Sequence, residues 1–283
     1  MIKNLLLCSD GSEHSKIAME TALQIAHKFD AKIHALNVIE SRDVGGSFFA
    51  DLSGAVGIVP YQNLYSQLNE LFTERGKAIL AVIEQACEED KVPFVSLLKT
   101  GDLAEVVQEE EKNIDLVIIG RNGEHLKLKD DFLGKSVERV IRISTKPCLI
   151  TADRPRQFSK AVIAFDGSEN SRRAFHAGME FVRKMEMQTT IISVDDGHTA
   201  KSQEALAWAS AHAAELGIKT ECKLLTGNPE EKILDFAHDS EVDIIIMGAY
   251  GHNRIREFII GSVTSSILFR STIPVLLGNN HHD

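Results

Sequence analysis

The sequence predicts an α/β protein made of two tandem, doubly wound domains, each with a five-stranded parallel sheet. Two observations lead to this prediction. Strand and helix patterns alternate along the whole chain, and the pattern of the first half returns in the second half. Alternation of this kind is typical of parallel strands that are covered by helices on both faces. A chain of 283 residues is long enough for two domains of ordinary size.

The repeat is visible in short matching segments. Asp10–Glu13 and Asp166–Glu169 both have the sequence Asp-Gly-Ser-Glu, and each follows an apolar run. Three further features occur once in each copy, namely a Thr-Gly dipeptide, a glycine after a predicted strand and a segment that contains proline. The pairs are Thr100-Gly101 with Thr226-Gly227, Gly120 with Gly248, and Lys146–Leu149 with Ile273–Leu276. The chain is therefore one unit written twice, and the first copy carries extra residues.

Short, β-branched apolar runs predict the strands, and apolar residues three or four positions apart predict the helices. In the first copy we expect strands near 2–8, 32–39, 93–98, 115–119 and 147–151, and helices near 14–28, 63–89, 102–112 and 135–144. In the second copy we expect strands near 160–165, 189–194, 219–225, 243–247 and 274–277, and helices near 170–185, 199–216, 229–239 and 262–270. The polar stretch Asp153–Gln157 breaks the pattern. We therefore place the first domain at 1–153 and the second at 158–283.

The extra residues of the first copy are expected at Glu40 to Gln62, between the second strand and the second helix. This segment is rich in glycine and predicts a long loop. Its aromatic pair, Phe48 and Phe49, is expected to pack as a flap on its own domain.

Composition narrows the class of protein. The net charge of −10 disfavours a surface for nucleic acid or for an anionic membrane. The N-terminal apolar run is short and is interrupted by Lys3, so we expect neither a signal peptide nor a membrane span, and we expect a cytoplasmic protein. The four cysteines have no Cys-x-x-Cys spacing, and Cys8 and Cys148 lie in predicted strands, where buried free thiols are expected.

The strongest chemical pattern runs from Ile244 to Ser262. A buried strand ends at Gly248, a polar loop follows, and Gly261-Ser262 begins a helix. A helix N-terminus has unpaired backbone N–H groups and a partial positive charge, so it attracts anions. Glycines allow a close approach of the backbone to a phosphate and permit positive φ angles. A phosphate-bearing ligand fits this arrangement, and Ser262 either caps the helix or turns its hydroxyl to a phosphate.

Two other strand ends are expected beside this loop. Ligands of doubly wound sheets bind at the carboxyl ends of strands, where the strand order switches. Asp166 ends the first strand of the second copy, and its carboxylate either accepts hydrogen bonds from ribose hydroxyls or caps the following turn. Val194 ends the next strand and is placed to pack against a flat base or in the core.

The spacing Gly248-x2-Gly251-x9-Gly261-Ser262 resembles that of the ATP-binding branch of the universal stress protein family. The resemblance covers both copies and implies an adenine nucleotide alpha hydrolase-like fold. It implies that ATP, AMP or ADP, with or without Mg²⁺, binds the second copy through a set of eight residues: Asp166, Val194, Met247, Gly248, Gly251, Gly261, Ser262 and Val263. Family members pair through the last strand, so the two copies are expected to pack as an intrachain pseudo-dimer. Strands near Cys148–Thr151 and Val275–Leu277 would then meet, and a homodimer of the tandem chain is a further expectation.

The first copy departs from this pattern. Its loop has a spacer one residue longer, and Lys135 replaces the serine at the helix start. Glu124, Asp130 and Asp131 also give the loop a charge that repels phosphates. We expect the first copy to be a poor or empty nucleotide site, with a few retained candidate residues: Asp10, Gly120, Gly123 and Gly134.

The sequence lacks the motifs of a phosphoryl-transfer or hydrolytic enzyme. It has no P-loop lysine, no His-x-x-x-His spacing and no nucleophile elbow, and we name no catalytic residue. His198, His212 and His238 are expected at the surface, and His252, Arg254 and Arg256 are expected as solvated loop residues. The favoured interpretation is a stress-response protein that binds an adenine nucleotide and acts as a regulator. Two alternatives stay open, namely a slow ATP hydrolase or nucleotidyl or phospho-transferase, and a dimerisation scaffold without nucleotide.

Overall fold

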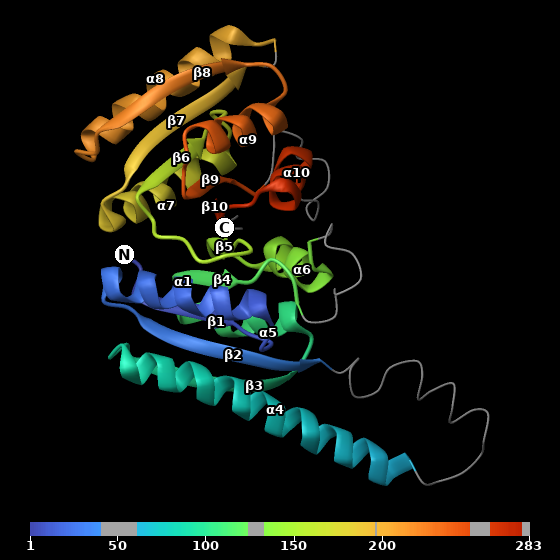
Figure 1. Cartoon of the computed structure of the whole chain (residues 1–283). Coiled ribbons are helices and arrows are strands. Elements are labelled where there is room, and N and C mark those ends of the chain that lie inside the picture. Colours follow the sequence, from blue (N-terminus) through green and yellow to red (C-terminus); the bar gives the residue numbers. More distant parts are fainter. Residues whose placement is uncertain (41–60, 124–132, 196, 250–260, 279–283) are drawn as a thin grey trace, which may run out of the picture.

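Ten strands form one continuous sheet that runs through the whole molecule (Figure 1). The computed structural model describes residues 1–40, 61–123, 133–195, 197–249 and 261–278. The strand order is β3-β2-β1-β4-β5-β10-β9-β6-β7-β8. All neighbouring strands are parallel except β5 and β10, which are antiparallel. Each half of the sheet therefore has the predicted five parallel strands, and both halves have the same internal order.

The bounds of the elements agree with the sequence prediction to within three residues at each end. The strands are β1 (Asn4–Cys8), β2 (Lys32–Glu40), β3 (Phe94–Gly101), β4 (Leu116–Ile119), β5 (Cys148–Ile150), β6 (Lys160–Ala164), β7 (Gln188–Asp195), β8 (Thr220–Thr226), β9 (Ile244–Gly248) and β10 (Val275–Gly278). The helices are α1 (Glu13–Phe29), α4 (Tyr61–Glu89), α5 (Leu103–Glu110), α6 (Lys135–Ile143), α7 (Glu169–Met185), α8 (Thr199–Glu215), α9 (Pro229–Asp239) and α10 (Ser262–Arg270). The helix predicted at 102–112 ends earlier, and a 3-10 turn (Glu111–Asn113) follows it.

The repeated Asp-Gly-Ser-Glu segments start equivalent helices. Ser12 caps α1 and Ser168 caps α7, because each serine hydroxyl accepts a hydrogen bond from the backbone N–H three residues later, at 3.2 Å. The glycine between the aspartate and the serine has a positive φ in both copies, 82° at Gly11 and 76° at Gly167. This conformation turns the chain from the strand into the helix with little steric cost.

Two hydrophobic cores lie on the two faces of the sheet. Side chains of α1, α4, α7 and α8 pack on one face, and those of α5, α6, α9 and α10 pack on the other. The strands serve both cores because successive side chains point to opposite faces, as Leu5 and Leu7 do on one side and Leu6 and Cys8 on the other. The helices cover the two faces of the sheet, and the loops that follow the strands lie at the carboxyl ends of the strands.

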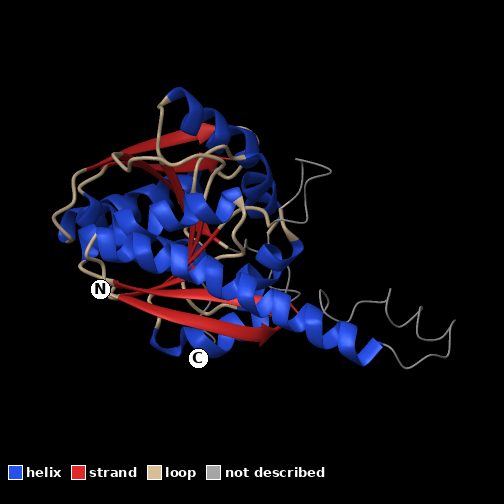
Figure 2. Cartoon of the chain, turned by 60° about the horizontal axis from the view of Figure 1, so that its bottom comes forward, coloured by secondary structure: helices blue, strands red, loops and turns tan. Residues whose placement is uncertain are grey.

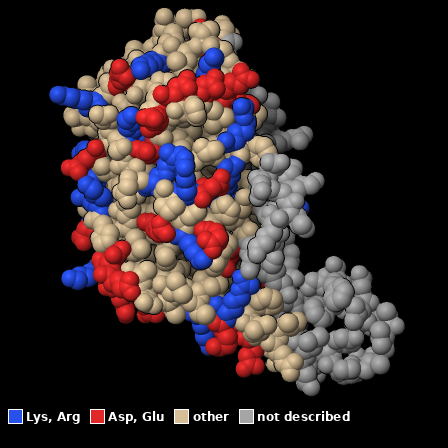
Figure 3. Space-filling model, in the orientation of Figure 1, with Lys and Arg blue, Asp and Glu red and all other residues tan. Residues whose placement is uncertain are grey.

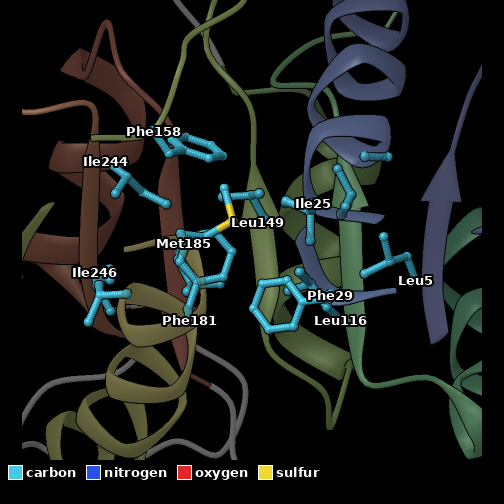
Figure 4. Close-up of a cluster of buried hydrophobic side chains, with 14 of the residues drawn as sticks. Leu5, Ile25, Phe29, Leu116, Leu149, Phe158, Phe181, Met185, Ile244 and Ile246 are labelled. Atoms are coloured by element: carbon cyan, nitrogen blue, oxygen red, sulfur yellow. The ribbon is translucent and has the colours of Figure 1, made fainter. Parts of the chain in front are cut away.

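The two halves join through β5 and β10 and through a shared aromatic cluster. The predicted meeting of the last strands is confirmed by the antiparallel pairs Ile150–Val275, Leu149–Leu276 and Cys148–Leu277. On one face of this junction, Phe29 of α1 stacks on Phe181 of α7 with ring centroids 5.9 Å apart (Figure 4). Phe158, from the connection between the halves, packs edge-on against Phe181 at 5.8 Å. The halves therefore form an intrachain pseudo-dimer with a continuous core.

The helix α4 is much longer than its counterpart in the second half. It has 29 residues, whereas α8 has 17. One end of α4 extends past the sheet in both views (Figures 1 and 2). The predicted loop 40–62 was therefore too long at both ends, because Glu40 belongs to β2 and residues 61–62 belong to α4. Residues 41–60, with the predicted flap of Phe48 and Phe49, lie outside the described residues.

Charged side chains of both signs cover the described surface. On the face seen in Figure 3, acidic and basic side chains of the described residues are interspersed. Among the described helices, none has the length and apolar character that crossing a bilayer requires. All four cysteines are free, and the expected burial of Cys8 and Cys148 is confirmed. Burial raises the pKa of the Cys87 thiol to about 11, and the neighbouring carboxylates of Asp90 and Glu84 add to this shift.

Candidate functional site

The predicted residues of the second half gather at the carboxyl ends of three neighbouring strands. β6 lies between β7 and β9 in the sheet, and the chain leaves β6 in one direction to β7 and returns on the other side at β9. This arrangement is a switch in strand order, where doubly wound sheets bind ligands. Val194 lies near the end of β7, Met247 and Gly248 end β9, and Asp166 follows β6. Val194 is half-buried and Met247 is buried, and both contribute to the core on one face.

Asp166 is exposed and takes part in the turn after β6. Its Oδ1 accepts a hydrogen bond from the Ser168 N–H at 2.9 Å. Asp10 makes the same bond to the Ser12 N–H at 2.9 Å in the first half. The turn-capping use of this aspartate is therefore present in both halves. This hydrogen bond uses the Oδ1 atom of Asp166. The contact of the Asp166 carboxylate with ribose hydroxyls stays a prediction.

The glycines at the ends of β4 and β9 have a packing role in the described structure. Gly120, Gly123, Gly134, Gly248 and Gly261 do not have positive φ angles, so the positive φ that glycine permits is not used at these positions. A Cβ on Gly248 would lie 3.0 Å from the backbone carbon of Asn170. A Cβ on Gly120 would lie 2.9 Å from the backbone of His14. These two glycines let the first turn of α7 or α1 pass close to the neighbouring strand end.

The start of α10 is attached directly to the end of β9. The Thr264 hydroxyl donates to the Gly248 carbonyl at 3.0 Å, and Thr264 is buried. Gly261 is the N-cap residue, and a glycine has no side chain with which to cap the helix. Of the two uses expected for Ser262, capping was therefore wrong, because Ser262 is the first helical residue and is exposed, and contact with a phosphate stays a prediction. Its hydroxyl and the first N–H groups of the helix lie at the edge where the strand ends meet.

Sequence reasoning missed Thr264, although it fixes the helix to the strand. The signal was present, since a threonine in the first turn of a helix has a hydroxyl that can bond to nearby backbone. Val263 is half-buried beside Thr264. Gly251, with the loop residues His252, Arg254 and Arg256, lies outside the described residues.

The equivalent edge of the first half contains a cavity of about 840 Å³. All four candidate residues of the first half line this cavity, and the three glycines among them contribute only backbone atoms. Asp10 and Gly123 are close neighbours, because a Cβ on Gly123 would lie 2.9 Å from Asp10 Oδ2. Gly134 is the N-cap residue of α6, which also has no side-chain cap. That the first copy binds nucleotide poorly remains a prediction. This cavity is the place where a ligand of the first domain would bind.

The walls of this cavity come from both strands and helices. Apolar side chains of β2, β4, α4, α5 and α6, together with Leu133 just before α6, form one part of its lining: Leu36, Val38, Ile39, Ile119, Phe72, Ile79, Leu103, Leu133 and Val137. Its charged lining residues are Asp10, Glu40, Arg75, Lys135 and Glu138. Sequence reasoning missed Glu40 and Arg75, because a β-strand end and a long helix come together here only in three dimensions.

An aromatic cluster lies behind the turn that holds Asp166. Phe165, the preceding residue, stacks on Trp208 of α8 with centroids 5.3 Å apart and an interplanar angle of 8°. His212 stacks on the same indole at 3.8 Å, and the Arg172 guanidinium lies over it at 4.4 Å. His212 lies on α8 as predicted and is half-buried, because its ring is covered on one side by the indole. Trp208 is the single tryptophan of the chain, and it packs on Phe165, the residue just before the predicted ligand contact Asp166.

Comparison with known proteins gives a consistent family over the whole chain. The Universal stress protein family matches residues 1–152 and 157–277. The universal stress protein Slr1230 of Synechocystis sp. is 32% identical over 97% of this chain and 99% of its own length. A universal stress protein from Archaeoglobus fulgidus DSM 4304 has the same tandem fold, with a TM-score of 0.75 at 21% identity, and 98% of each chain is covered.

A third structure shares only part of the chain. It is the universal stress protein from Archaeoglobus fulgidus in complex with dAMP, which covers 43% of this chain and 98% of its own, with 23% identity and a TM-score of 0.36. That overlap is too small for a residue-by-residue comparison.

Proposed function

Because the chain belongs to the universal stress protein family, we propose that its second domain binds an adenine nucleotide, ATP in the first place, and that the bound nucleotide regulates the protein. The observation that carries this proposal is the position of the start of α10, whose N-cap residue is the glycine Gly261. It is held against the end of β9 by the bond from Thr264 to Gly248, at the switch point of the strand order.

The physical argument concerns the phosphates first. The first turn of α10 offers unpaired N–H groups and the positive end of the helix dipole, both of which stabilise phosphate oxygens. The exposed Ser262 is the first residue of α10, so its hydroxyl can donate to the same phosphate oxygens as these N–H groups. In this proposal Gly248, Gly251, Gly261, Ser262 and Val263 surround the phosphates.

The other strand ends contact the nucleoside. Val194 and Met247 offer apolar surface to the adenine base, and the Asp166 carboxylate accepts hydrogen bonds from ribose hydroxyls. A Mg²⁺ ion would enter with the phosphates of ATP. The domain bounds in this proposal are 1–153 and 158–283.

The regulatory part of the proposal follows from the contact between the end of β9 and the start of α10. A ligand shifts a conformational equilibrium only when it binds one state more tightly than the other. Phosphate contacts that bridge the end of β9 and the start of α10 favour the state in which the two are docked. A partner that contacts α10 would respond to this change. We place the protein in the cytoplasm, and we propose that the tandem chain forms a homodimer.

Isothermal titration with ATP and Mg²⁺ tests the site directly. We expect a single site per chain in the wild type and loss of binding in a Gly261→Asp, Ser262→Ala double variant, because the new carboxylate lies where the phosphates bind. The matched control is Gly134→Asp, Lys135→Ala at the start of α6 in the first domain, which should leave binding unchanged.

Four results would count against the proposal. An unchanged affinity in the second-domain variant would place the site elsewhere. Absence of binding in the folded wild type would favour a dimerisation scaffold. Release of ADP and phosphate during the titration would favour the ATP hydrolase alternative, and transfer of a phosphoryl or nucleotidyl group to an acceptor would favour a transferase.

A further inference from the structure

Arg121 of the first domain forms a hydrogen bond with the second domain. Its guanidinium Nη1 donates to the backbone carbonyl of Ser271, which follows α10 as its C-cap residue. Arg121 is half-buried and Ser271 is buried. A positive charge at the C-terminus of a helix also interacts favourably with the helix dipole. The first domain therefore holds the end of the helix whose start is the proposed phosphate site.

The antiparallel junction of the two halves explains why these residues meet. Ile119 of β4 is in register with Ile150 of β5, and Ile150 is in register with Val275 of β10. Because β5 and β10 run in opposite directions, the carboxyl end of β4 lies near the amino end of β10. Arg121 lies two residues after Ile119, and Ser271 lies four residues before Val275. Both residues therefore belong to the same edge of the sheet.

The corresponding position of the second half has a different residue. The equivalent register runs from Met247 of β9 through Leu277 of β10 to Cys148 of β5. The residue that lies two positions after Met247, as Arg121 does after β4, is Ala249. The methyl group of an alanine cannot donate a hydrogen bond. The bond from Arg121 to α10 therefore connects the two domains in one direction, from the first to the second.

The end of α6, the last helix of the first domain, has its own anchor. Ser144, the C-cap residue of α6, donates its hydroxyl to Glu111 at 2.7 Å, and the Thr145 N–H donates to the same carboxylate at 2.9 Å. Glu111 is buried and lies in the 3-10 turn of the first domain. A first-domain side chain thus contacts the end of each last helix, Glu111 for α6 and Arg121 for α10.

Two bonds at opposite ends fix the direction of α10. At its start, the Thr264 hydroxyl donates to the Gly248 carbonyl at 3.0 Å, and at its end Arg121 donates to Ser271. The helix has only nine residues, so it moves as one short rigid body. Without the bond from Arg121, α10 would pivot about Thr264. Its first N–H groups would then point away from the place where the phosphates bind.

We propose that Arg121 is a positioning residue through which the first domain sets the affinity of the second domain for phosphates. This inference rests on the proposed adenine-nucleotide site at the start of α10. Arg121 acts through α10 and does not contact the nucleotide. The phosphates are bound by α10, whereas the nucleoside contacts Asp166, Val194 and Met247 on other elements. Loss of Arg121 should therefore weaken the binding of phosphates and leave that of the nucleoside nearly unchanged.

Isothermal titration of the full chain compares ATP with adenosine, whose affinity is measured by its competition with ATP. We expect Arg121→Met to bind ATP about fivefold or more weakly than the wild type, and adenosine within about twofold, as for a coupling of ordinary size between distant groups. Arg121→Lys should bind ATP within about twofold of the wild type, because an ammonium group can donate to the same carbonyl.

Arg139→Met is the matched control. Arg139 lies on α6, and its guanidinium pairs with Asp102 inside the first domain. This substitution removes a first-domain guanidinium that has no part in the contact with α10. It should leave the affinities for ATP and for adenosine unchanged.

Hydrogen exchange in the ligand-free protein tests the anchor without nucleotide. Arg121→Met should speed the exchange of α10 amides at least about tenfold, as expected for the loss of a hydrogen bond from a charged group. The amides of α6, which is held by Glu111, should keep their wild-type rates. Arg121→Lys should restore the slow exchange of α10.

Several outcomes would overturn the inference. An unchanged ATP affinity in Arg121→Met, or an equal loss for ATP and adenosine, would remove the positioning role. The same loss in Arg121→Lys or in Arg139→Met would show that the donated bond to α10 is not the cause. Unchanged exchange of α10 would show that Arg121 does not hold the helix. Failure of the proposed ATP site is seen separately, because the wild type then binds no ATP or the Gly261→Asp, Ser262→Ala variant binds it equally well.

Discussion

Leu149 of β5 and Leu276 of β10 face each other in antiparallel register at the centre of the ten-stranded sheet. Both are buried, with 0% and 2% of their surface exposed. They contribute to the same core as Phe29 and Phe181 from the two halves. The pair therefore ties the first domain to the second through main-chain hydrogen bonds and side-chain packing at once.

Replacing Leu149 by alanine should destabilise the chain strongly. Loss of a buried leucine costs about 2–5 kcal/mol, because apolar contacts are lost and a cavity remains. Urea unfolding followed by circular dichroism measures the change in the free energy of unfolding. Leu71→Ala is the control, since Leu71 on α4 is 62% exposed and should change this free energy very little. Equal effects of the two variants would contradict the shared core.

Trp208 should report nucleotide binding in the second domain. It is the only tryptophan, and it stacks on Phe165, which precedes Asp166 in the chain. Binding that draws the Asp166 turn toward ribose should alter this stacking and the contact with Arg172. We expect tryptophan emission to change with ATP in the wild type. The Gly261→Asp, Ser262→Ala variant should show no change, and a change of equal size in that variant would separate the signal from the proposed site.

Asp195 should make the stability of the second domain depend on pH. A hydrogen bond from the Thr199 hydroxyl, and further bonds from the N–H groups of Gly197 and His198, hold the pKa of Asp195 below its ordinary value of 3.8. A carboxyl with a lowered pKa in the folded state contributes stability above the unfolded pKa. That contribution is lost as the pH falls through the lower, folded value.

Comparing wild type with Asp195→Ala by urea unfolding tests this dependence. The difference in the free energy of unfolding should be constant between pH 5 and 7 and should shrink below about pH 3.8, where Asp195 of the unfolded chain is protonated. Asp239→Ala is a suitable control, because its carboxylate is exposed at the end of α9. A difference that grows as the pH falls would contradict the assigned hydrogen bonds.

The sequence was sufficient for the fold because each element has a strong local pattern. Buried strands such as Ile244–Gly248 are continuous apolar runs, and the copied Asp-Gly-Ser-Glu segments fix where α1 and α7 begin. The repeat predicted two equivalent halves, the meeting of β5 with β10 came from the family resemblance, and the order of the strands comes from the structure. The start of α4 was predicted two residues late, because the glycine-rich segment before it gives no clear helix start.

The site was predictable only in part, because it depends on contacts between distant segments. Asp166, Val194 and Gly248 could be placed together because the carboxyl ends of parallel strands share one edge. The position of Thr264 in the first turn of α10 indicates only that its hydroxyl can bond to nearby backbone. Its bond to Gly248, like the bond from Ser136 to Glu40, joins residues of different elements, so the local sequence does not identify the partner. The close approach of Asn170 to Gly248 likewise depends on how α7 packs.

The central claim is that one adenine nucleotide binds per chain, at the start of α10. The most direct test is to purify the protein, denature it, and count the released nucleotide per chain by mass spectrometry after loading with ATP. We expect one ATP per wild-type chain and none in the Gly261→Asp, Ser262→Ala variant. Two ATP molecules per chain would contradict the single site, and retention of ATP by the variant would contradict the assignment to α10.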